Sequence, residues 1–223
     1  MKETICTIPI NDIFMPKDGC PFCRMEKMLE EQYVRFITGD AMMEPSVRIE
    51  TNKKGFCRRH FEQMQTEGQK LPNALILESH LQEIIDIYMP KKLRGKPDKK
   101  QLENLKKELS SCYVCDRIES DMHHFMATIF VEWAKGGEFR KLYNEQPFIC
   151  LKHYHFVMSA ATGKGGLSSK LIPDFYAETA ALTKNYLMSL KKDITHFCSM
   201  FDYRSQGQEW GTSIDAIERS TDF

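Results

Sequence analysis

The sequence has no excess of charge of either sign, because Lys+Arg and Asp+Glu both number 31 among its 223 residues. A balanced chain has no general electrostatic attraction to nucleic acid or to acidic membrane surfaces. No segment approaches the roughly 18 consecutive apolar residues that a bilayer-crossing helix needs. The stretch from Met1 to Asp12 also lacks the continuous apolar core of a secretory signal peptide, so we expect a cytoplasmic protein.

Two further absences bear on fold class and on activity. No segment alternates polar and β-branched residues with a period of two, so no strand is predicted. The loop at residues 163–166 (Gly-Lys-Gly-Gly) lacks the GxxxxGK pattern, followed by Ser or Thr, of a nucleotide-binding P-loop. Apolar residues instead recur at helical spacing, and 42% of the chain is hydrophobic, which is enough to bury a core. The sequence therefore predicts an all-α fold.

Turn and capping residues set the expected helix boundaries. A helix should begin at Cys20, with Pro21 in the first position, where a missing N–H costs little. Further helices are expected over residues 112–135 and 174–201, each with an apolar stripe. Residues 1–19 and 45–56 are expected to be irregular, since both contain turn-forming residues.

Cysteine is the residue type that forms a clear pattern. Six of the eight cysteines fall in a motif that occurs twice, a CxxC pair followed by a CxxH pair. The first set is Cys20, Cys23, Cys57 and His60, and the second set is Cys112, Cys115, Cys150 and His153. The segments between the pairs have nearly equal lengths, 33 and 34 residues. Reduced cysteines at such spacing are more often metal ligands than disulfides.

The chemistry of these residues favours zinc. Positions i and i+3 lie on one face of a helix, so each pair presents two donors side by side. We expect each CxxC to share one ion with the CxxH that follows it, giving two Zn²⁺ per chain in tetrahedral Cys₃His sites. Positive helix N-termini would offset the charge of three thiolates. Four protein donors leave no open position, which is typical of structural sites; an iron–sulfur cluster is the alternative.

The repeated motif also predicts the domain organisation. We interpret it as a duplicated helical module whose two copies pack about a pseudo-twofold axis. The first metal-binding module would span residues 1–92 and the second residues 112–223. Residues 93–111 would be a charged linker and helix between them.

The sequence leaves several functions open. The favoured hypothesis is a zinc-stabilised interaction or regulatory module for an unknown protein or small-molecule partner, without a membrane role or a catalytic residue. One alternative is a thiol-redox or metal-dependent enzyme in which a thiolate such as Cys20 or Cys112 reacts. Another is weak nucleic-acid binding through residues 91–107, although no aromatic residues interleave these cations. His80, His123, His155 and His196 have no second ligand at a telling spacing, and each is expected to be a hydrogen-bonded or a surface histidine.

Several segments resemble a known family. They are residues 1–4 with Ile8-Pro9, the first CxxC pair, residues 42–45 (Met-Met-Glu-Pro) and residues 55–61 around the first CxxH pair. Together they resemble a family of uncharacterised bacterial proteins that is catalogued only as a domain of unknown function. The resemblance implies a bacterial, cytoplasmic protein. It supplies no activity, substrate or catalytic residue.

Overall fold

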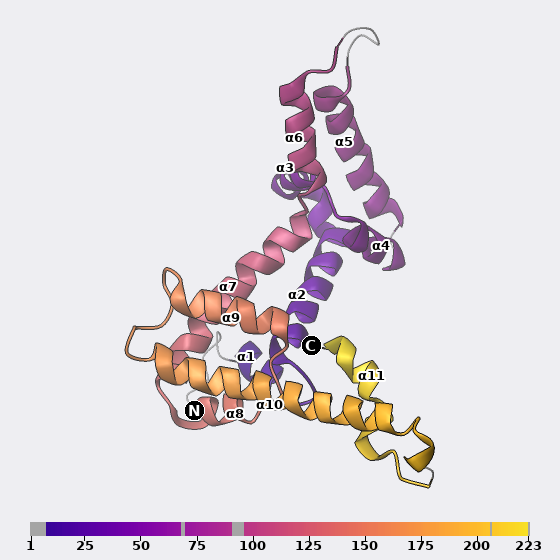
Figure 1. Cartoon of the computed structure of the whole chain (residues 1–223). Coiled ribbons are helices and arrows are strands. Elements are labelled where there is room, and N and C mark those ends of the chain that lie inside the picture. Colours follow the sequence, from indigo (N-terminus) through magenta and orange to yellow (C-terminus); the bar gives the residue numbers. More distant parts are fainter. Residues whose placement is uncertain (1–7, 68–69, 91–95, 206, 223) are drawn as a thin grey trace. The chain divides into compact units, whose positions relative to one another are not determined.

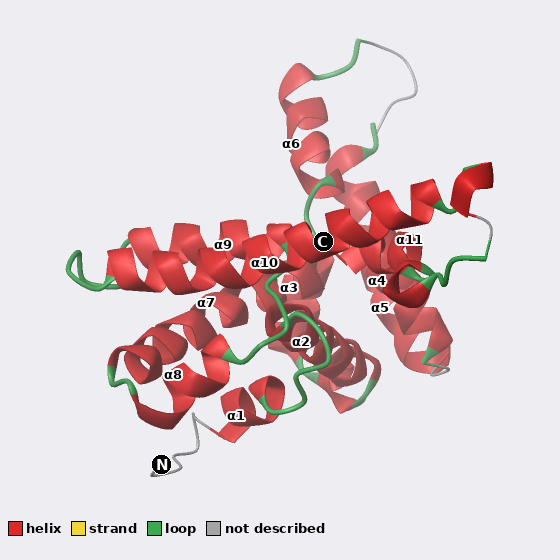
Figure 2. Ribbon diagram, turned by 60° about the horizontal axis from the view of Figure 1, so that its bottom comes forward, coloured by secondary structure: helices red, strands yellow, loops and turns green. Residues whose placement is uncertain are grey.

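The computed structural model describes residues 8–67, 70–90, 96–205 and 207–222. Within these ranges the chain forms helices joined by loops and turns, and no strand, as Figure 2 shows by colour. The all-α prediction is thereby confirmed. In the part of the chain that is described, no helix is both long enough and apolar enough to cross a membrane.

The chain divides into two compact units. Unit 1 consists of Met1–Met25 and His123–Phe223, and unit 2 consists of Glu26–Met122. The boundaries fall inside two helices, α2 (Pro21–Thr38) and α7 (Tyr113–Ala134), so each of them belongs to both units. These units are defined by contacts. The duplicated modules at 1–92 and 112–223, the linker at 93–111 and the pseudo-twofold axis stay predictions.

Unit 1 is built around its long helix α10. Its other elements are α1 (Ile8–Phe14), α8 (Gly137–Asn144), α9 (Leu151–Thr162), α11 (Ala216–Arg219) and the 3-10 turns η2 (Tyr203–Ser205), η3 (Gly211–Ser213) and η4 (Ser220–Asp222). α10 spans Ile172–Ser199 and packs against α9, and both figures show the two side by side. Phe175 of α10 lies edge-on to Trp133, with ring centroids 4.9 Å apart. Such aromatic pairs contribute about 0.5–1.5 kcal/mol of stability beyond that from their buried area.

Helix α1 corrects the expectation that residues 1–19 are irregular. Ile10, Ile13 and Phe14 are buried at helical spacing, so this short helix has one fully apolar face. Phe14 contacts Phe22 and Tyr143 at centroid distances of 5.8 and 5.9 Å. Tertiary packing of that face stabilises a helix that is too short to form alone. Residues 1–7 lie outside the described part of the chain.

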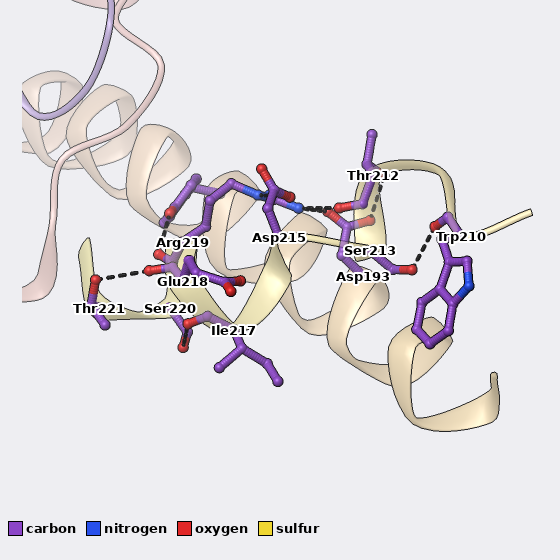
Figure 3. A network of polar contacts seen from close by, with 11 residues as sticks. Asp193, Trp210, Thr212, Ser213, Asp215, Ile217, Glu218, Arg219, Ser220 and Thr221 are labelled. Atoms are coloured by element: carbon purple, nitrogen blue, oxygen red, sulfur yellow. Dashed lines mark hydrogen bonds and ion pairs between the residues drawn. The ribbon is translucent and has the colours of Figure 1, made fainter. Parts of the chain in front are cut away.

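Arg219 connects the last turns of unit 1 to α10, together with Thr212 (Figure 3). Arg219 of α11 forms ion pairs of 2.8 Å with Asp193 of α10 and with Asp215. It also donates to the carbonyl oxygen of Thr212, and Thr212 donates to Asp193 at 2.9 Å. The network connects the short turns after α10 to that helix.

The helices of unit 2 are all shorter than α10. They are η1 (Asp40–Met43), α3 (Pro45–Lys54), α4 (Arg58–Thr66), α5 (Lys70–Tyr88) and α6 (Lys99–Leu109). Within this unit α2 is bonded to α7, because the Tyr33 hydroxyl donates to Asp121 at 2.5 Å. This bond and the partial burial of the phenol raise the pKa of Tyr33 to about 12, burial being the larger cause.

Helix α3 corrects the expectation that residues 45–56 form a loop. Pro45 occupies the first position, where its fixed φ favours a helix start. Gly55 ends the helix with a φ of 58°, and its N–H donates to the Thr51 carbonyl. The polar run before Gly55 is therefore the basic last turn of a helix, in which Lys53 and Lys54 complement the negative end of the dipole.

Helices α5 and α6 form a lightly buried pair in unit 2 (Figure 1). Ile76 is the buried residue of α5, and no side chain of α6, all of which is described, is buried. Asp98 caps α6 by accepting a hydrogen bond of 2.9 Å from the Lys100 N–H. Residues 91–95, at the start of the predicted basic linker, lie outside the described ranges.

Candidate metal centres

The eight predicted ligands gather in two clusters, one in each unit. Unit 1 contains the cluster of Cys20, Cys23, Cys150 and His153, and unit 2 contains the cluster of Cys57, His60, Cys112 and Cys115. In each cluster the four ligand atoms lie within 4.8 Å of one another. Each set of three sulfurs and one imidazole nitrogen can hold a metal ion.

In the unit 1 cluster the imidazole lies among the sulfurs. His153 Nδ1 is 3.2 Å from Cys150 Sγ, 3.3 Å from Cys23 Sγ and 3.8 Å from Cys20 Sγ. The sulfurs of Cys23 and Cys150 are 3.6 Å apart, well beyond the ~2.05 Å of a disulfide. Three of these residues are buried, and Cys23 is exposed.

The unit 2 cluster has the same arrangement. His60 Nδ1 lies 3.2 Å from the sulfurs of Cys57 and Cys112 and 3.4 Å from that of Cys115. The sulfurs of Cys57 and Cys115 are 3.9 Å apart. In both clusters the Nδ1 atom faces the sulfurs, which leaves Nε2 for another partner.

The grouping of the pairs corrects the prediction. Each CxxC was expected to share an ion with the CxxH that follows it, but each lies with the CxxH of the other half of the sequence. The reason lies in α2, which carries the chain away from Cys20. His60 bonds to Glu30 of α2, and ten residues of helix span about 15 Å. The first CxxH pair therefore meets α2 too far along the helix to reach Cys20.

Helix starts bring the donors together. Cys57 and Cys150 are the N-cap residues of α4 and α9, with nearly identical backbone angles, φ −69° and ψ 159° against φ −66° and ψ 160°. Cys20 and Cys112 immediately precede α2 and α7. Each cluster thus lies at two helix N-termini, whose partial positive charge favours thiolates.

Glu30 is a residue of the unit 2 site that sequence reasoning missed. Its buried carboxylate lies 2.8 Å from His60 Nε2 and accepts a 2.6 Å bond from Arg59 Nη2. With Nδ1 facing the sulfurs, Nε2–H can donate to this carboxylate, which would fix the ring and increase its basicity as a ligand. The available signal was a carboxylate on the apolar face of a helix, since Glu30 precedes buried Val34 by four residues.

The thiols of each cluster perturb one another's pKa values. Hydrogen bonding to Cys150 and Cys20 raises the pKa of Cys23, whereas hydrogen bonds from Cys20 and Cys23 lower the pKa of Cys150. In unit 2, burial raises the pKa values of Cys112 and Cys115, and the charge of Cys112 raises that of Cys115 further. Three adjacent thiolates repel one another, and a bound cation removes that cost.

The two candidate histidine ligands, His60 and His153, are both buried. Burial lowers the pKa of His60, while its bond to Glu30 acts in the opposite direction.

Of the cysteines outside the motif, Cys198 is exposed on α10, and Cys6 lies outside the described residues. Neither cluster needs them, since each already contains four donors.

The comparisons with known proteins identify a family without an assigned activity. A family model described as "Family of unknown function (DUF6062)" matches residues 1–223, the whole chain. No curated protein and no solved structure matches the chain. These comparisons therefore supply no ligand, partner or reaction.

Proposed function

We propose that this chain, which belongs to the DUF6062 family, is a zinc-stabilised helical protein that acts as an interaction or regulatory module. Its partner would be a protein or a small ligand. The observation that carries the proposal is the closure of both clusters, since each offers four protein donors at the N-termini of two helices. Closed Cys₃His sites are typical of structural zinc rather than of catalysis.

The spacing of the donors supports zinc over an iron–sulfur cluster. Around one tetrahedral ion with Zn–S bonds of ~2.3 Å, neighbouring sulfurs lie about 3.8 Å apart. The sulfurs of Cys23 and Cys150 lie 3.6 Å apart in unit 1, and those of Cys57 and Cys115 lie 3.9 Å apart in unit 2. In a [4Fe–4S] cluster each protein ligand binds a different iron, and in a [2Fe–2S] cluster two ligands bind each iron, so ligands on different irons lie farther apart than around one ion. When bound, zinc would supply folding energy by tying helix starts together.

Metal analysis combined with thiol titration tests this proposal. We expect two zinc ions per purified chain, and thiols in both clusters that react slowly with a disulfide reagent under native conditions. A control in denaturant with a chelator should expose all eight cysteines. Fewer than two ions, or iron with sulfide, would contradict the proposal.

Thiol-redox chemistry is the second candidate, because one cysteine of each cluster is exposed. These are Cys23 and Cys115, whereas Cys20 and Cys112, the thiolates first considered, are buried. A rapidly reacting CxxC pair with a rapidly exchanging metal would favour this candidate.

Nucleic-acid binding through residues 91–107 stays a prediction. It is tested by whether the affinity for nucleic acid falls steeply with salt.

A further inference from the structure

Helix α5 of unit 2 has an apolar face that the described residues leave exposed. Leu71, Leu81 and Ile85 are 68%, 52% and 54% exposed. Together with exposed Ala74 they recur at intervals of three, seven and four residues, which places them on one side of the helix. The other side carries buried Ile76. A helix that is apolar on both sides is typical of a buried position, so the exposed side is expected to pack against a protein surface.

Helix α6 of the same unit has an exposed stripe of a second kind. Leu102 and Leu109 are exposed, and exposed Lys99 and Lys106 alternate with them at intervals of three and four residues. No side chain of α6, all of which is described, is buried. This stripe is therefore both apolar and basic.

The stripe of α5 has the opposite charge. Exposed Glu78 lies on the same side as Ala74 and Leu81, four residues after the one and three before the other. Neither Glu78 nor Lys106 forms an ion pair with another described residue. An acidic apolar stripe and a basic apolar stripe are complementary surfaces, and here one chain carries both.

Both stripes lie on the side of the helix pair that faces away from α3. Ser79 of α5 bonds to Asn52 of α3 at 2.9 Å, and Asn104 of α6 lines a hollow together with Asn52. Two residues turn a helix by about 200°. Leu81 and Leu102, each two residues from one of these positions, therefore lie on the opposite side, and the two stripes form one continuous face.

The two helices are antiparallel, which sets the register of the stripes. Gln101 of α6 donates to the Ile87 carbonyl of α5 at 2.7 Å. Farther from the connection between the helices, His80 of α5 and Glu108 of α6 both lie beside Gly55. The last turn of α6 is therefore level with the middle of α5 (Figure 1).

We propose that this face binds a second copy of the chain, with α5 of each copy packed against α6 of the other in an antiparallel four-helix bundle. A twofold axis parallel to the helices keeps every residue level with its counterpart. Ile85 then faces Leu102 of the second copy, and Glu78 lies within about one helical turn of the second copy's Lys106, in reach of its long side chain. Packing like helices together would instead bring the two basic stripes face to face.

The proposal goes beyond the function proposed above, because neither metal cluster takes part in this contact. Sedimentation equilibrium of the zinc-loaded 223-residue chain tests it at protein concentrations from about 1 to about 100 μM. We expect the mass to rise to twice the 26.0 kDa of one chain. A monomer at every concentration would overturn the proposal.

A matched pair of apolar positions locates the interface. Leu81→Asp should raise the Kd of the dimer at least about tenfold, because it places a charge in the apolar contact. Ile49→Asp, at an exposed position of α3 and outside the proposed face, should leave the Kd unchanged. Equal Kd values for the two variants would place the contact elsewhere and overturn the proposal.

Exchange of charge between copies is the sharpest test. Glu78→Lys and Lys106→Glu should each raise the Kd at least about tenfold, because each brings like charges together. An equal mixture of these two variants should regain wild-type affinity, since one chain then has two bases at these positions and the other has two acids. Lys100→Glu, exposed and outside the stripe, is the control and should leave the Kd unchanged. A mixture no tighter than either variant alone would contradict contact between α5 of one copy and α6 of the other.

Zinc content is measured on every sample. Two ions per chain in a protein that stays monomeric contradict this inference alone. Fewer than two ions per chain contradict the function proposed above, whatever the mass.

Discussion

Units 1 and 2 hold equivalent donor clusters but differ in packing, because unit 1 has the larger buried aromatic core and unit 2 includes a lightly buried helix pair. In unit 1 the ring of Phe22 lies 6.0 Å from that of His153, and Phe22 itself contacts Phe14. In unit 2, α5 buries Ile76 and α6 buries none of its residues, all of which are described. The same set of donors therefore contributes a different share of the stability of each unit.

Magnitudes indicate the consequence of this difference. Metal binding to small zinc domains is worth roughly 10–16 kcal/mol, and a whole domain is typically stable by about 5–15 kcal/mol. A unit with little apolar burial cannot replace such a contribution. We therefore interpret unit 2 as the more metal-dependent half of the molecule.

Chelation should produce the largest effect. Removing the metal with a strong chelator should abolish hydrogen-exchange protection in α3–α6, while α8–α10 keep partial protection from their aromatic core. Peptide-resolved exchange before and after chelation measures this, and re-addition of zinc is the control. Equal loss in both units would remove the proposed difference between them.

Substitution of one ligand comes next. Cys57→Ser should destabilise the protein by about 3–5 kcal/mol, because it breaks a metal site. Cys198→Ser, at an exposed position outside both clusters, should change the free energy of unfolding by less than about 0.5 kcal/mol. Denaturant titrations of both variants give the comparison. If they unfold alike, Cys57 is not a ligand.

Glu30 tests the site beyond its direct ligands. Glu30→Gln should weaken zinc binding in unit 2 by about 10- to 100-fold, as for other carboxylates that orient a histidine ligand. The unit 1 site should be unchanged, since Glu30 belongs to unit 2. Competition with a chromophoric chelator resolves the two affinities. Glu31→Gln, an exposed neighbour, is the matched control and should leave both affinities intact.

Glu178 of unit 1 should show the smallest effect, and one that depends on pH. Burial alone would raise its pKa, but bonds from Arg140, Asn144 and Trp133 outweigh burial and lower it. The carboxylate therefore contributes stability above the ordinary pKa of 4.5, and this is lost as pH falls through the lowered value. Glu178→Gln should cost about 1–2 kcal/mol at neutral pH.

The difference in unfolding free energy between the wild-type protein and Glu178→Gln should shrink in acid. Urea titrations from pH 7 to pH 3 follow it, with Glu138→Gln as the control, since Glu138 forms an exposed ion pair with Lys141. A difference that does not vary with pH would show that Glu178 acts through shape rather than charge.

The sequence was sufficient to predict the helical fold and the eight residues that gather in the two clusters. Spacing of three places two side chains on one face of a helix, and residues such as Pro21 mark a helix start without reference to the rest of the fold. These features are local, so a single chain reveals them. Helices α1 and α3 are exceptions. Tertiary packing of its apolar face stabilises α1, and the basic end of α3 and Gly55 fit a turn as well as a helix terminus.

The pairing of the motifs could not be read in this way. Equal spacing suggested that Cys23 and Cys57 share an ion. Spacing along the chain does not determine where the far end of a long helix lies in space. The length of α2 and the bond between Glu30 and His60 decide the outcome. Long-range contacts of this kind depend on the packing of several elements at once.

Zinc stoichiometry in two double variants tests the pairing most directly. Cys23→Ser with Cys150→Ser removes two donors from one cluster, so one intact site should keep its zinc against a competing chelator. Cys23→Ser with Cys57→Ser removes one donor from each cluster, so neither site should keep wild-type affinity. The account predicts one tightly held ion in the first protein and none in the second. The opposite result would mean that each CxxC binds with the CxxH that follows it in the sequence.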